Sequence, residues 1–358
     1  MASKKQSLPL MVADDNGYAD HKLAWFDENG DIMTLKVPAI IQLGGQGLSS
    51  GTGKQIGAYK YKEYDYHCSV GVTDPLKIRT PDYPTTIANR VLMVHSLTKA
   101  GKLGLPVELA VTLPFREMFN QDGTINAKLR EATASNFVQN DVQVLGSEAK
   151  PNVVKSVVYA EALSAWFDWA IKADGSMADG YTDMVDMQGQ MLVVDIGGST
   201  TDLACVQIIE DEMLILHQKS GTEKMGVLDA KAAFTELMRV SMAKDGLTFA
   251  GNESVLPATF VNTLFEKGRG TWQSKNWDLT KERDQACRGI AERISSYIKS
   301  RAGDPNMFYA ILVVGGGAIV FADMLKQLLP NAIFSDEFAN ARGALKVLRD
   351  KRNETADA

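Results

Sequence analysis

The sequence contains the same succession of expected elements twice, and this duplication constrains the fold more than any other feature. Each copy consists of an apolar strand, a turn that holds an aspartate and at least one glycine, and two further strands joined by a short turn. The expected strands are residues 8–13, 22–26 and 31–37 in the first copy, and 191–195, 202–209 and 213–218 in the second. Two α/β domains of related topology, facing each other across a cleft, would account for this repetition.

Further elements are expected between and after the two copies. Helical spacing of apolar residues predicts helices over 85–99, 127–137, 153–171, 228–242, 281–301 and 338–349, with another ending near Leu329. Short apolar runs predict strands over 107–112, 141–145 and 310–314. Residues 42–57 are rich in glycine, serine and glutamine, and we expect an exposed loop or hairpin tip there. Residues 245–280 are mixed and polar, and no element can be assigned to them.

The length of 358 residues is sufficient for two domains. The expected boundaries are 1–175 and 176–335 for the domains, and about 37–82 and 228–280 for a small subdomain in each. The last helix, within 336–358, is expected to return to the first domain. The chain would then cross between the domains near 148–155 and near 335–342, and these crossings would form a hinge.

Composition narrows the class of protein. Apolar residues make up 45% and charged residues 23%, as in ordinary globular proteins, and no uncharged apolar run is long enough for a membrane helix. The net charge of −6 argues against a protein that grips nucleic acid directly. Three widely spaced cysteines are typical of a reducing compartment. We therefore expect a cytoplasmic protein without direct contacts to nucleic acid or membrane.

The two aspartate-glycine turns form the first candidate binding site. Glycine allows backbone N–H groups to approach an anion such as phosphate, and nearby hydroxyl groups add donors. Aspartates repel phosphate but can hold Mg²⁺ through water molecules, so Asp15 and Asp195 are candidate metal residues. The candidate phosphate-binding residues are Gly17, Tyr18, Lys22, Gly197, Gly198, Ser199, Thr200 and Thr201. Turn geometry alone explains the aspartate and glycine of the first turn about as well as phosphate binding does. The five small or hydroxyl residues of the second turn favour phosphate binding.

A third glycine cluster follows the expected strand 310–314 and suits a flat ligand that lies against the backbone. It comprises Gly315, Gly316, Gly317 and Ala318. It is not a dinucleotide-binding fingerprint, because Val320 stands where that pattern requires glycine. Residues 51–54 are not a Walker phosphate loop either, since Gln55 replaces the required serine or threonine. The four histidines show no metal-binding spacing.

These motifs in combination resemble the actin, Hsp70 and sugar kinase superfamily, and within it the ParM/StbA plasmid segregation proteins. The segments that carry the resemblance are 15–17, 104–107, 111–114, 193–202, 315–317 and 338–343. Tyr18 departs from many actins, which have a small hydroxyl residue at this position. The resemblance implies an actin-like, ribonuclease H-like, duplicated two-domain fold with a nucleotide cleft between the domains.

The same resemblance implies an activity and partners. The chain would bind ATP, or GTP, with Mg²⁺, hydrolyse it, and polymerise head to tail into filaments. Those filaments would move plasmid DNA through a DNA-binding adaptor protein of ParR type. In ParM-like proteins a glutamate after a strand orients the attacking water. Glu148 is the corresponding candidate here, because it is the only acid between the elements expected at 141–145 and 153–171. Glu148 and Asp195 are thus the two candidate catalytic residues. A small-molecule kinase and a chaperone-like ATPase of the same superfamily remain as alternatives.

Overall fold

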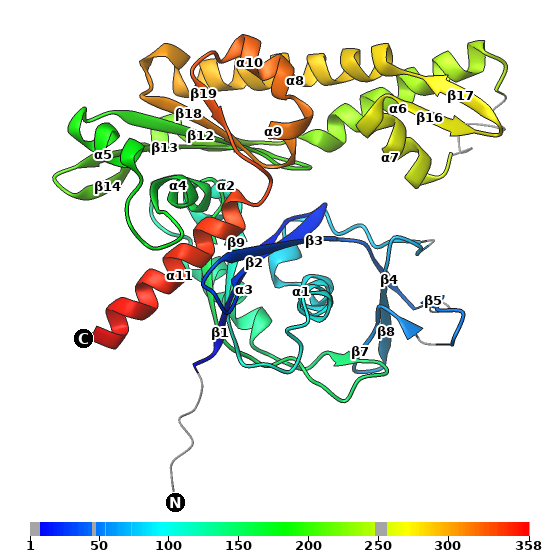
Figure 1. Ribbon diagram of the computed structural model, residues 1–358, viewed down its shortest axis with the longest axis horizontal. Helices are drawn as coiled ribbons and strands as arrows, with labels where there is room; N and C mark the ends of the chain where they lie inside the picture. Colours follow the sequence, from blue (N-terminus) through cyan, green and yellow to red (C-terminus); the bar gives the residue numbers. More distant parts are fainter. Residues whose placement is uncertain (1–7, 45–47, 54, 73, 248–255, 358) are drawn as a thin grey trace, which may run out of the picture.

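The computed structural model describes residues 8–44, 48–53, 55–72, 74–247 and 256–357 and contains two main sheets, one in each half of the molecule (Figure 1). The first has the strand order β11-β9-β1-β2-β3, and the second β14-β13-β12-β18-β19 with β15 beside β13. The first-sheet strands are β1 (Leu10–Asn16), β2 (Asp20–Phe26), β3 (Ile32–Pro38), β9 (Val107–Leu113) and β11 (Val153–Ala160). Those of the second are β12 (Gln190–Ile196), β13 (Thr201–Ile209), β14 (Glu212–Ile215), β15 (Gly221–Glu223), β18 (Ala310–Val314) and β19 (Ala332–Phe334). The duplicated meander predicted from the sequence is thus confirmed, with β1-β2-β3 and β12-β13-β14 each antiparallel.

Smaller sheets extend both halves. A four-stranded sheet in the order β10-β7-β8-β4 adjoins the first half, and a two-stranded pair, β5-β6, extends beyond it (Figure 1). A hairpin, β16-β17, lies beside helix α7 in the second half. These strands are β4 (Ile41–Leu43), β5 (Leu48–Ser49), β6 (Gln55–Ile56), β7 (Ala58–Tyr61), β8 (Tyr64–Cys68), β10 (Gln143–Val144), β16 (Arg269–Trp272) and β17 (Lys275–Asp278).

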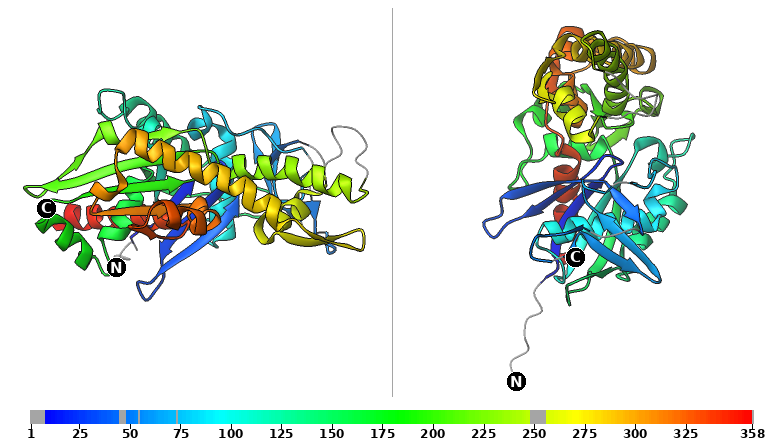
Figure 2. Two further views of the ribbon diagram at one scale, coloured as in Figure 1. Left: turned by 90° about the horizontal axis from the view of Figure 1, so that it is seen from above. Right: turned by 90° about the vertical axis from the view of Figure 1, so that its right-hand side faces the viewer.

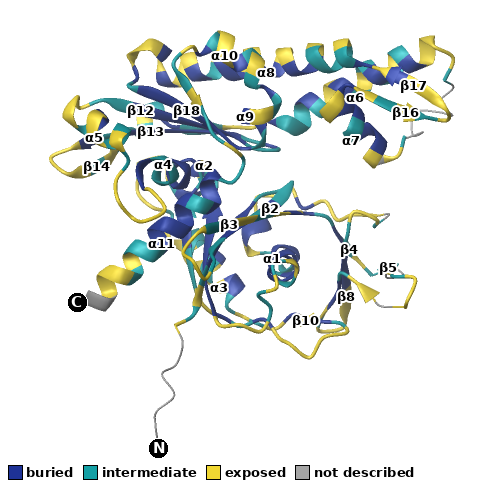
Figure 3. Ribbon diagram, in the orientation of Figure 1, coloured by how far each residue is buried: buried dark blue, intermediate teal, exposed yellow. Residues whose placement is uncertain are grey.

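Helices cover both main sheets. In the first half they are α1 (Ile87–Lys99), α2 (Phe115–Met118), α3 (Ala127–Phe137) and α4 (Leu163–Ala170). The second half has α5 (Asp179–Asp186), α6 (Val227–Lys244), α7 (Ala258–Lys267), α8 (Thr280–Ala302), α9 (Gly316–Val320) and α10 (Ala322–Leu328), and α11 (Ala339–Asp357) follows. Buried residues concentrate between the helices and the sheets (Figure 3). None of the helices in the described part of the chain has the length and apolar character needed to cross a membrane.

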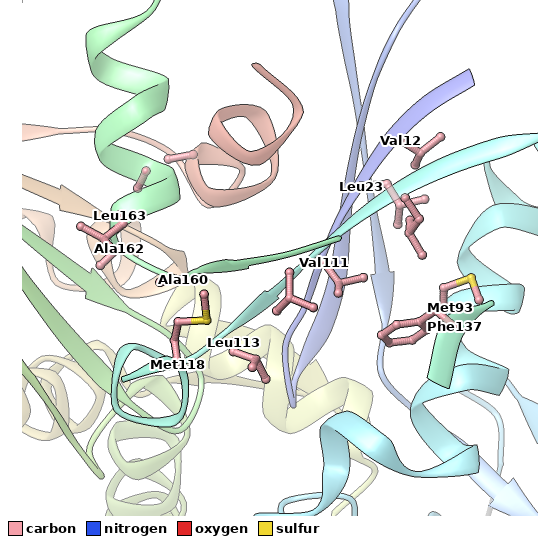
Figure 4. Packing of buried hydrophobic residues seen from close by; sticks show 14 of the residues in the cluster. Val12, Leu23, Met93, Val111, Leu113, Met118, Phe137, Ala160, Ala162 and Leu163 are labelled. Atoms are coloured by element: carbon pink, nitrogen blue, oxygen red, sulfur yellow. The ribbon is translucent and has the colours of Figure 1, made fainter. Parts of the chain in front are cut away.

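One predicted helix is wrong over half its length. Residues 153–171 comprise strand β11, which pairs in parallel with β9, followed by the short helix α4. The β-branched and aromatic residues of β11 suit a pleated strand, whereas the Ala- and Trp-containing α4 retains the helical pattern. Figure 4 shows how the core continues across this junction, with Leu113, Met118, Ala160 and Ala162 close together. Because β11 belongs to the first sheet, the first crossing predicted near 148–155 is also wrong, and the chain leaves this sheet after Ala160.

Helix α11 returns from the second half to the first sheet, where it packs against β1, β2, β9 and α4 (Figures 1 and 2). The closest approach is between α11 and α4. A Cβ atom on Gly343 would lie 1.6 Å from the carbonyl oxygen of Ser164 and 2.9 Å from the backbone nitrogen of Asp168. Only glycine therefore allows the two helices to lie at this separation.

Substituting Gly343 by alanine should destabilise the protein because the two helices must move apart. Overpacking of this kind costs roughly 1–3 kcal/mol or more, measured as a loss in the free energy of unfolding in urea. The matched control is Gly289→Ala in α8, where, apart from its chain neighbours and the backbone of its own helix, nothing in the described structure lies within 4 Å of the added methyl group. That control should be neutral or stabilising by up to about 1 kcal/mol. Equal stability of both variants would contradict the packing argument.

Candidate functional site

A cavity lies between the two halves and is lined by residues from both. Its volume is about 770 Å³, within the usual range for a site that encloses a small molecule. Of the residues predicted from the sequence, those that line it are Asp15, Gly17, Tyr18, Lys22, Asp195, Gly197, Gly198, Ser199, Thr200 and Gly316. Two turns that are far apart in the sequence therefore open onto the same space.

The first turn connects β1 to β2 and is held by a buried ion pair. Asp15 and Lys22 are direct partners in the antiparallel register, and Lys22 Nζ lies 2.9 Å from Asp15 Oδ2. Thr112 Oγ1, on the neighbouring strand β9, donates to the other carboxylate oxygen of Asp15 over 2.8 Å. Burial by itself lowers the pKa of Lys22, but Asp15 and Asp195 raise it above its usual value. A fixed positive charge therefore stands beside the turn.

The second turn connects β12 to β13 and is packed against the start of α6. Gly197 N donates to Thr200 O over 2.9 Å, and the N–H groups of Val227 and Leu228 donate to the carbonyl oxygens of Gly197 and Gly198. Ser199 lines the cavity, and its buried hydroxyl has no hydrogen-bond partner among the described residues. A change of the Ser199 rotamer would make this hydroxyl a donor to a ligand in the cavity.

Asp195 is the buried carboxylate at the end of β12. Its Oδ2 accepts a hydrogen bond of 2.6 Å from Asn340 Nδ2, at the start of α11. Burial raises the pKa of Asp195, and repulsion from Asp15 and Asp202 raises it further, while Lys22 and Asn340 oppose the shift. The carboxylates of Asp15 and Asp195 beside the ammonium group of Lys22 favour a cationic ligand or cofactor next to an anionic one.

The remaining predicted residues of the second turn and the third glycine cluster have packing roles. Thr201 is fully buried, and its hydroxyl donates to Met225 O. A Cβ atom on Gly315 (φ +82°) would lie 2.5 Å from Asp195 Oδ1, and one on Gly317 would lie 2.2 Å from Ile196 Cγ2. Gly315, Gly317 and Ala318 thus allow α9 to pack on β12, and Gly316 alone of this cluster lines the cavity.

Comparison with protein families gives two matches that follow each other along the chain. The family described as plasmid segregation protein ParM, N-terminal, matches residues 10–172. The family described as archaeal actin homologue MreB-like, C-terminal, matches residues 193–327. The chain has the actin-like fold. The predicted fold class is confirmed.

Solved structures agree with this assignment. The chain matches a 15-stranded ParM filament from Clostridium botulinum with a TM-score of 0.73 at 18% identity, covering 96% of this chain and 100% of that one. It matches an archaeal actin homologue, Ta0583, in complex with ADP with a TM-score of 0.69 at 16% identity, covering 95% and 99%. Identities this low show a shared fold. None of the curated proteins that were compared with this actin-like protein matches it in sequence.

Of the two glutamates that flank β11 in this actin-like protein, Glu161 lines the cavity and Glu148 does not. Glu148 is exposed in the loop between β10 and β11 and does not line the cavity. Glu161 lines it and directly follows β11. Burial raises the pKa of Glu161 well above its usual value, as does repulsion from Asp15. The sequence signal for Glu161 is the run of β-branched residues in β11, which is typical of a strand and lies within the segment predicted as a helix.

The far wall of the cavity is built by α6, α7 and α8, and none of its residues was predicted for the site. Helices α6 and α8 correspond to the predicted helices 228–242 and 281–301, whereas α7 lies in the segment 245–280, to which the sequence assigns no element. The residues of these helices that line the cavity are Val227, Leu228, Lys231, Asn262, Phe265, Glu266 and Arg283. Burial lowers the pKa of Lys231, and Glu266 opposes this shift. This wall therefore combines an aromatic ring with polar and charged groups that can bind a polar organic ligand.

A further acid near the first turn should give this actin-like protein a measurable pH dependence. Burial raises the pKa of Glu117 to about 7, opposed by Lys224 and Tyr18, and its Oε2 has no partner among the described residues. The folded state thus disfavours the charged form, so this penalty is absent below the unfolded pKa of about 4.5 and grows as the pH rises to about 7. Glu117→Gln should raise the melting temperature at pH 8 but not at pH 4.5.

The control for this experiment is Glu131→Gln, which removes an exposed acid from α3. As an exposed substitution, it should change the melting temperature little. An equal shift for Glu117→Gln at both pH values would show that this side chain is as well solvated in the folded protein as in the unfolded chain.

Proposed function

We propose that this actin-like protein binds and hydrolyses a nucleoside triphosphate, with ATP as the first candidate, in the cavity between its halves. The observation that carries the proposal is the convergence of two aspartate-glycine turns from different sheets on one cavity, beside Lys22 and Glu161. The ADP complex of the archaeal actin homologue, which shares this fold, supports a nucleotide as the ligand.

The phosphate groups would lie between the two turns. The backbone at Gly17 and Gly198 can approach them closely, the unpaired Ser199 hydroxyl can donate to them once its side chain turns toward the cavity, and Lys22 supplies positive charge. The base and sugar would then occupy the wall formed by α6, α7 and α8 together with Gly316.

Mg²⁺ fits the chemistry of this site through water molecules. Asp15 and Asp195 provide the hard oxygen ligands that Mg²⁺ prefers, but no group of three or more potential metal-binding acids, histidines or cysteines exists among the described residues. Magnesium retains several waters, so two aspartates of this kind can hold it indirectly. A bound Mg²⁺ would neutralise negative charge on the phosphoryl group.

Glu161 is the proposed group that orients the attacking water and accepts its proton. It lines the cavity at the carboxyl end of β11, and its raised pKa suits a proton acceptor better than that of an exposed glutamate would. Asp195 lies at the corresponding end of β12 in the other half. The two carboxylates would thus act on the nucleotide from opposite halves.

Filament assembly and plasmid segregation form the biological part of the proposal. The ParM N-terminal family match and the similarity to a ParM filament support head-to-tail self-association. The net charge of −6 favours contact with plasmid DNA through an adaptor of ParR type over direct binding. The division into domains 1–175 and 176–335, with α11 returning to the first, is part of the same proposal.

The proposal is tested with the purified chain, ATP or GTP, and Mg²⁺. Light scattering and electron microscopy should show filaments that need both nucleotide and Mg²⁺, and phosphate release should follow assembly. ADP in place of ATP, and chelation of Mg²⁺, serve as controls. Absence of nucleotide binding, or transfer of phosphate to an added sugar without filaments, would overturn the proposal.

A further inference from the structure

One side chain in the first turn of α11 is bonded to both halves of the molecule. Asn340 Nδ2 donates to Asp195 Oδ2 over 2.6 Å, and Asn340 Oδ1 accepts from the backbone nitrogen of Ala162 over 3.0 Å. Because a peptide N–H can only donate, the amide oxygen must face Ala162. This fixes the NH₂ group of Asn340 toward Asp195. The side chain is 4% exposed and lines the cavity.

The peptide that Asn340 holds directly follows Glu161. Ala162 is completely buried and has φ 63° and ψ −45°, a conformation that residues other than glycine rarely adopt. Such a conformation persists only where the surrounding structure fixes it. The bond from Asn340 is one of the contacts that fix it, and it acts one residue away from Glu161.

The first turn of α11 is itself held firmly on α4. Arg342 Nε lies 2.9 Å from Asp168 Oδ2, and Lys346 Nζ lies 2.7 Å from Asp168 Oδ1. Lys346 also donates to the carbonyl oxygen of Ile171, at the end of the same helix. These contacts fix Asn340 relative to α4, the helix that begins just after Glu161. The amide of Asn340 therefore couples the position of α4 to that of Asp195.

We infer that Asn340 is a positioning residue for nucleotide hydrolysis, which sets the place of Glu161 relative to Asp195 across the cavity. The inference rests on the proposed function. The inference goes beyond the proposed function because it gives a role to Asn340, which acts through the two residues that it bonds rather than on the reacting atoms. The sequence analysis did not single out this asparagine, since neither of its partners is near it in the chain.

The substitution Asn340→Asp should retain one of the two hydrogen bonds of this side chain and remove the other. The aspartate keeps an oxygen for Ala162 N but replaces the donor to Asp195 with a second carboxylate oxygen, which repels it. Displacement of a positioned group by about 1 Å can lower a rate about 100-fold. We therefore expect hydrolysis under saturating nucleotide to fall by roughly 30- to 100-fold. The affinity for ATP, from titration with a fluorescent analogue, should stay within about threefold of the wild type.

A double-mutant cycle with Glu161→Gln separates positioning from general damage. If Asn340 acts by placing Glu161, Asn340→Asp should have an effect of less than about threefold once Glu161 has been replaced, because residues that act as a unit are not additive. The same fold-loss in both backgrounds would mean a merely structural role and would overturn the inference. An unchanged rate in the single variant would also overturn it.

Two further variants keep the test decisive. Asn331→Asp makes the same chemical change at a partly buried asparagine outside the cavity, and should leave hydrolysis unchanged. If Asn340→Asp does not fold, as judged by its melting curve, Asn340→Ala enters the same cycle with the same criteria. A wild-type chain that does not hydrolyse nucleotide overturns the proposed function itself, whereas a hydrolysing wild type with additive variants overturns this inference alone.

Discussion

Glu161→Gln should bind ATP nearly normally and hydrolyse it roughly 10² to 10⁴ times more slowly. Glutamine has almost the same size as glutamate, so it preserves the cavity wall, but it cannot accept a proton from water. Phosphate release from preformed filaments measures hydrolysis, and titration with a fluorescent nucleotide measures affinity. Filaments of the variant should persist, because their disassembly is expected to follow hydrolysis.

The matched control is Glu148→Gln, which tests the glutamate selected from the sequence. Its side chain is exposed and remote from the cavity lining, so its rate of hydrolysis should equal that of the wild type. The reverse result, with Glu148→Gln slow and Glu161→Gln normal, would mean that the loop between β10 and β11 moves to the nucleotide in the active state.

Asp195→Asn should lower Mg²⁺-dependent hydrolysis by a factor on the order of 10² or more. The amide is neutral and cannot replace the carboxylate that faces Asp15 across the cavity. The same change should raise the melting temperature at neutral pH, since burial and the repulsion from Asp15 and Asp202 disfavour a charge at this position. Loss of activity together with a gain in stability would separate a functional role from misfolding.

Phosphate release at several Mg²⁺ concentrations, combined with thermal unfolding, checks this second prediction. Asp211→Asn, in the exposed turn between β13 and β14, provides a control in the same sheet. It should change neither quantity appreciably. Normal turnover in Asp195→Asn would remove Asp195 from the proposed site.

The features that could be predicted from the sequence are those that depend on short segments. The Asp15 turn and Lys22 come together because a three-residue connection in an antiparallel pair places them in register, and the sequence already placed both residues close to this turn. The predicted helix 127–137 and strand 310–314 match α3 and β18 residue for residue. In these cases the local pattern and the final packing favour the same structure.

The features that could not be predicted depend on contacts between distant segments. The segment 153–171 has apolar residues at positions that fit either a helix or a buried strand, and the parallel pairing of β11 with β9 decides between them. Glu161 was missed for this reason. Asn340 acquires its partners only when α11 returns to α4, so the pattern of segment 338–343, which carries part of the family resemblance, gives this asparagine no role in the site.

The return of α11 to the first sheet also dictates the order in which the protein can be completed during synthesis. Ala13, Ala24 and Ala110 of that sheet are covered by Ala341, Ala344, Leu345 and Leu348 of α11. At about 5–20 residues per second, the ribosome makes these covering residues roughly 10–40 s after β11. Until then the nascent chain exposes an apolar sheet face and lacks the amide that links Asp195 to Ala162. A nascent chain therefore lacks a complete core in its first half until α11 has emerged.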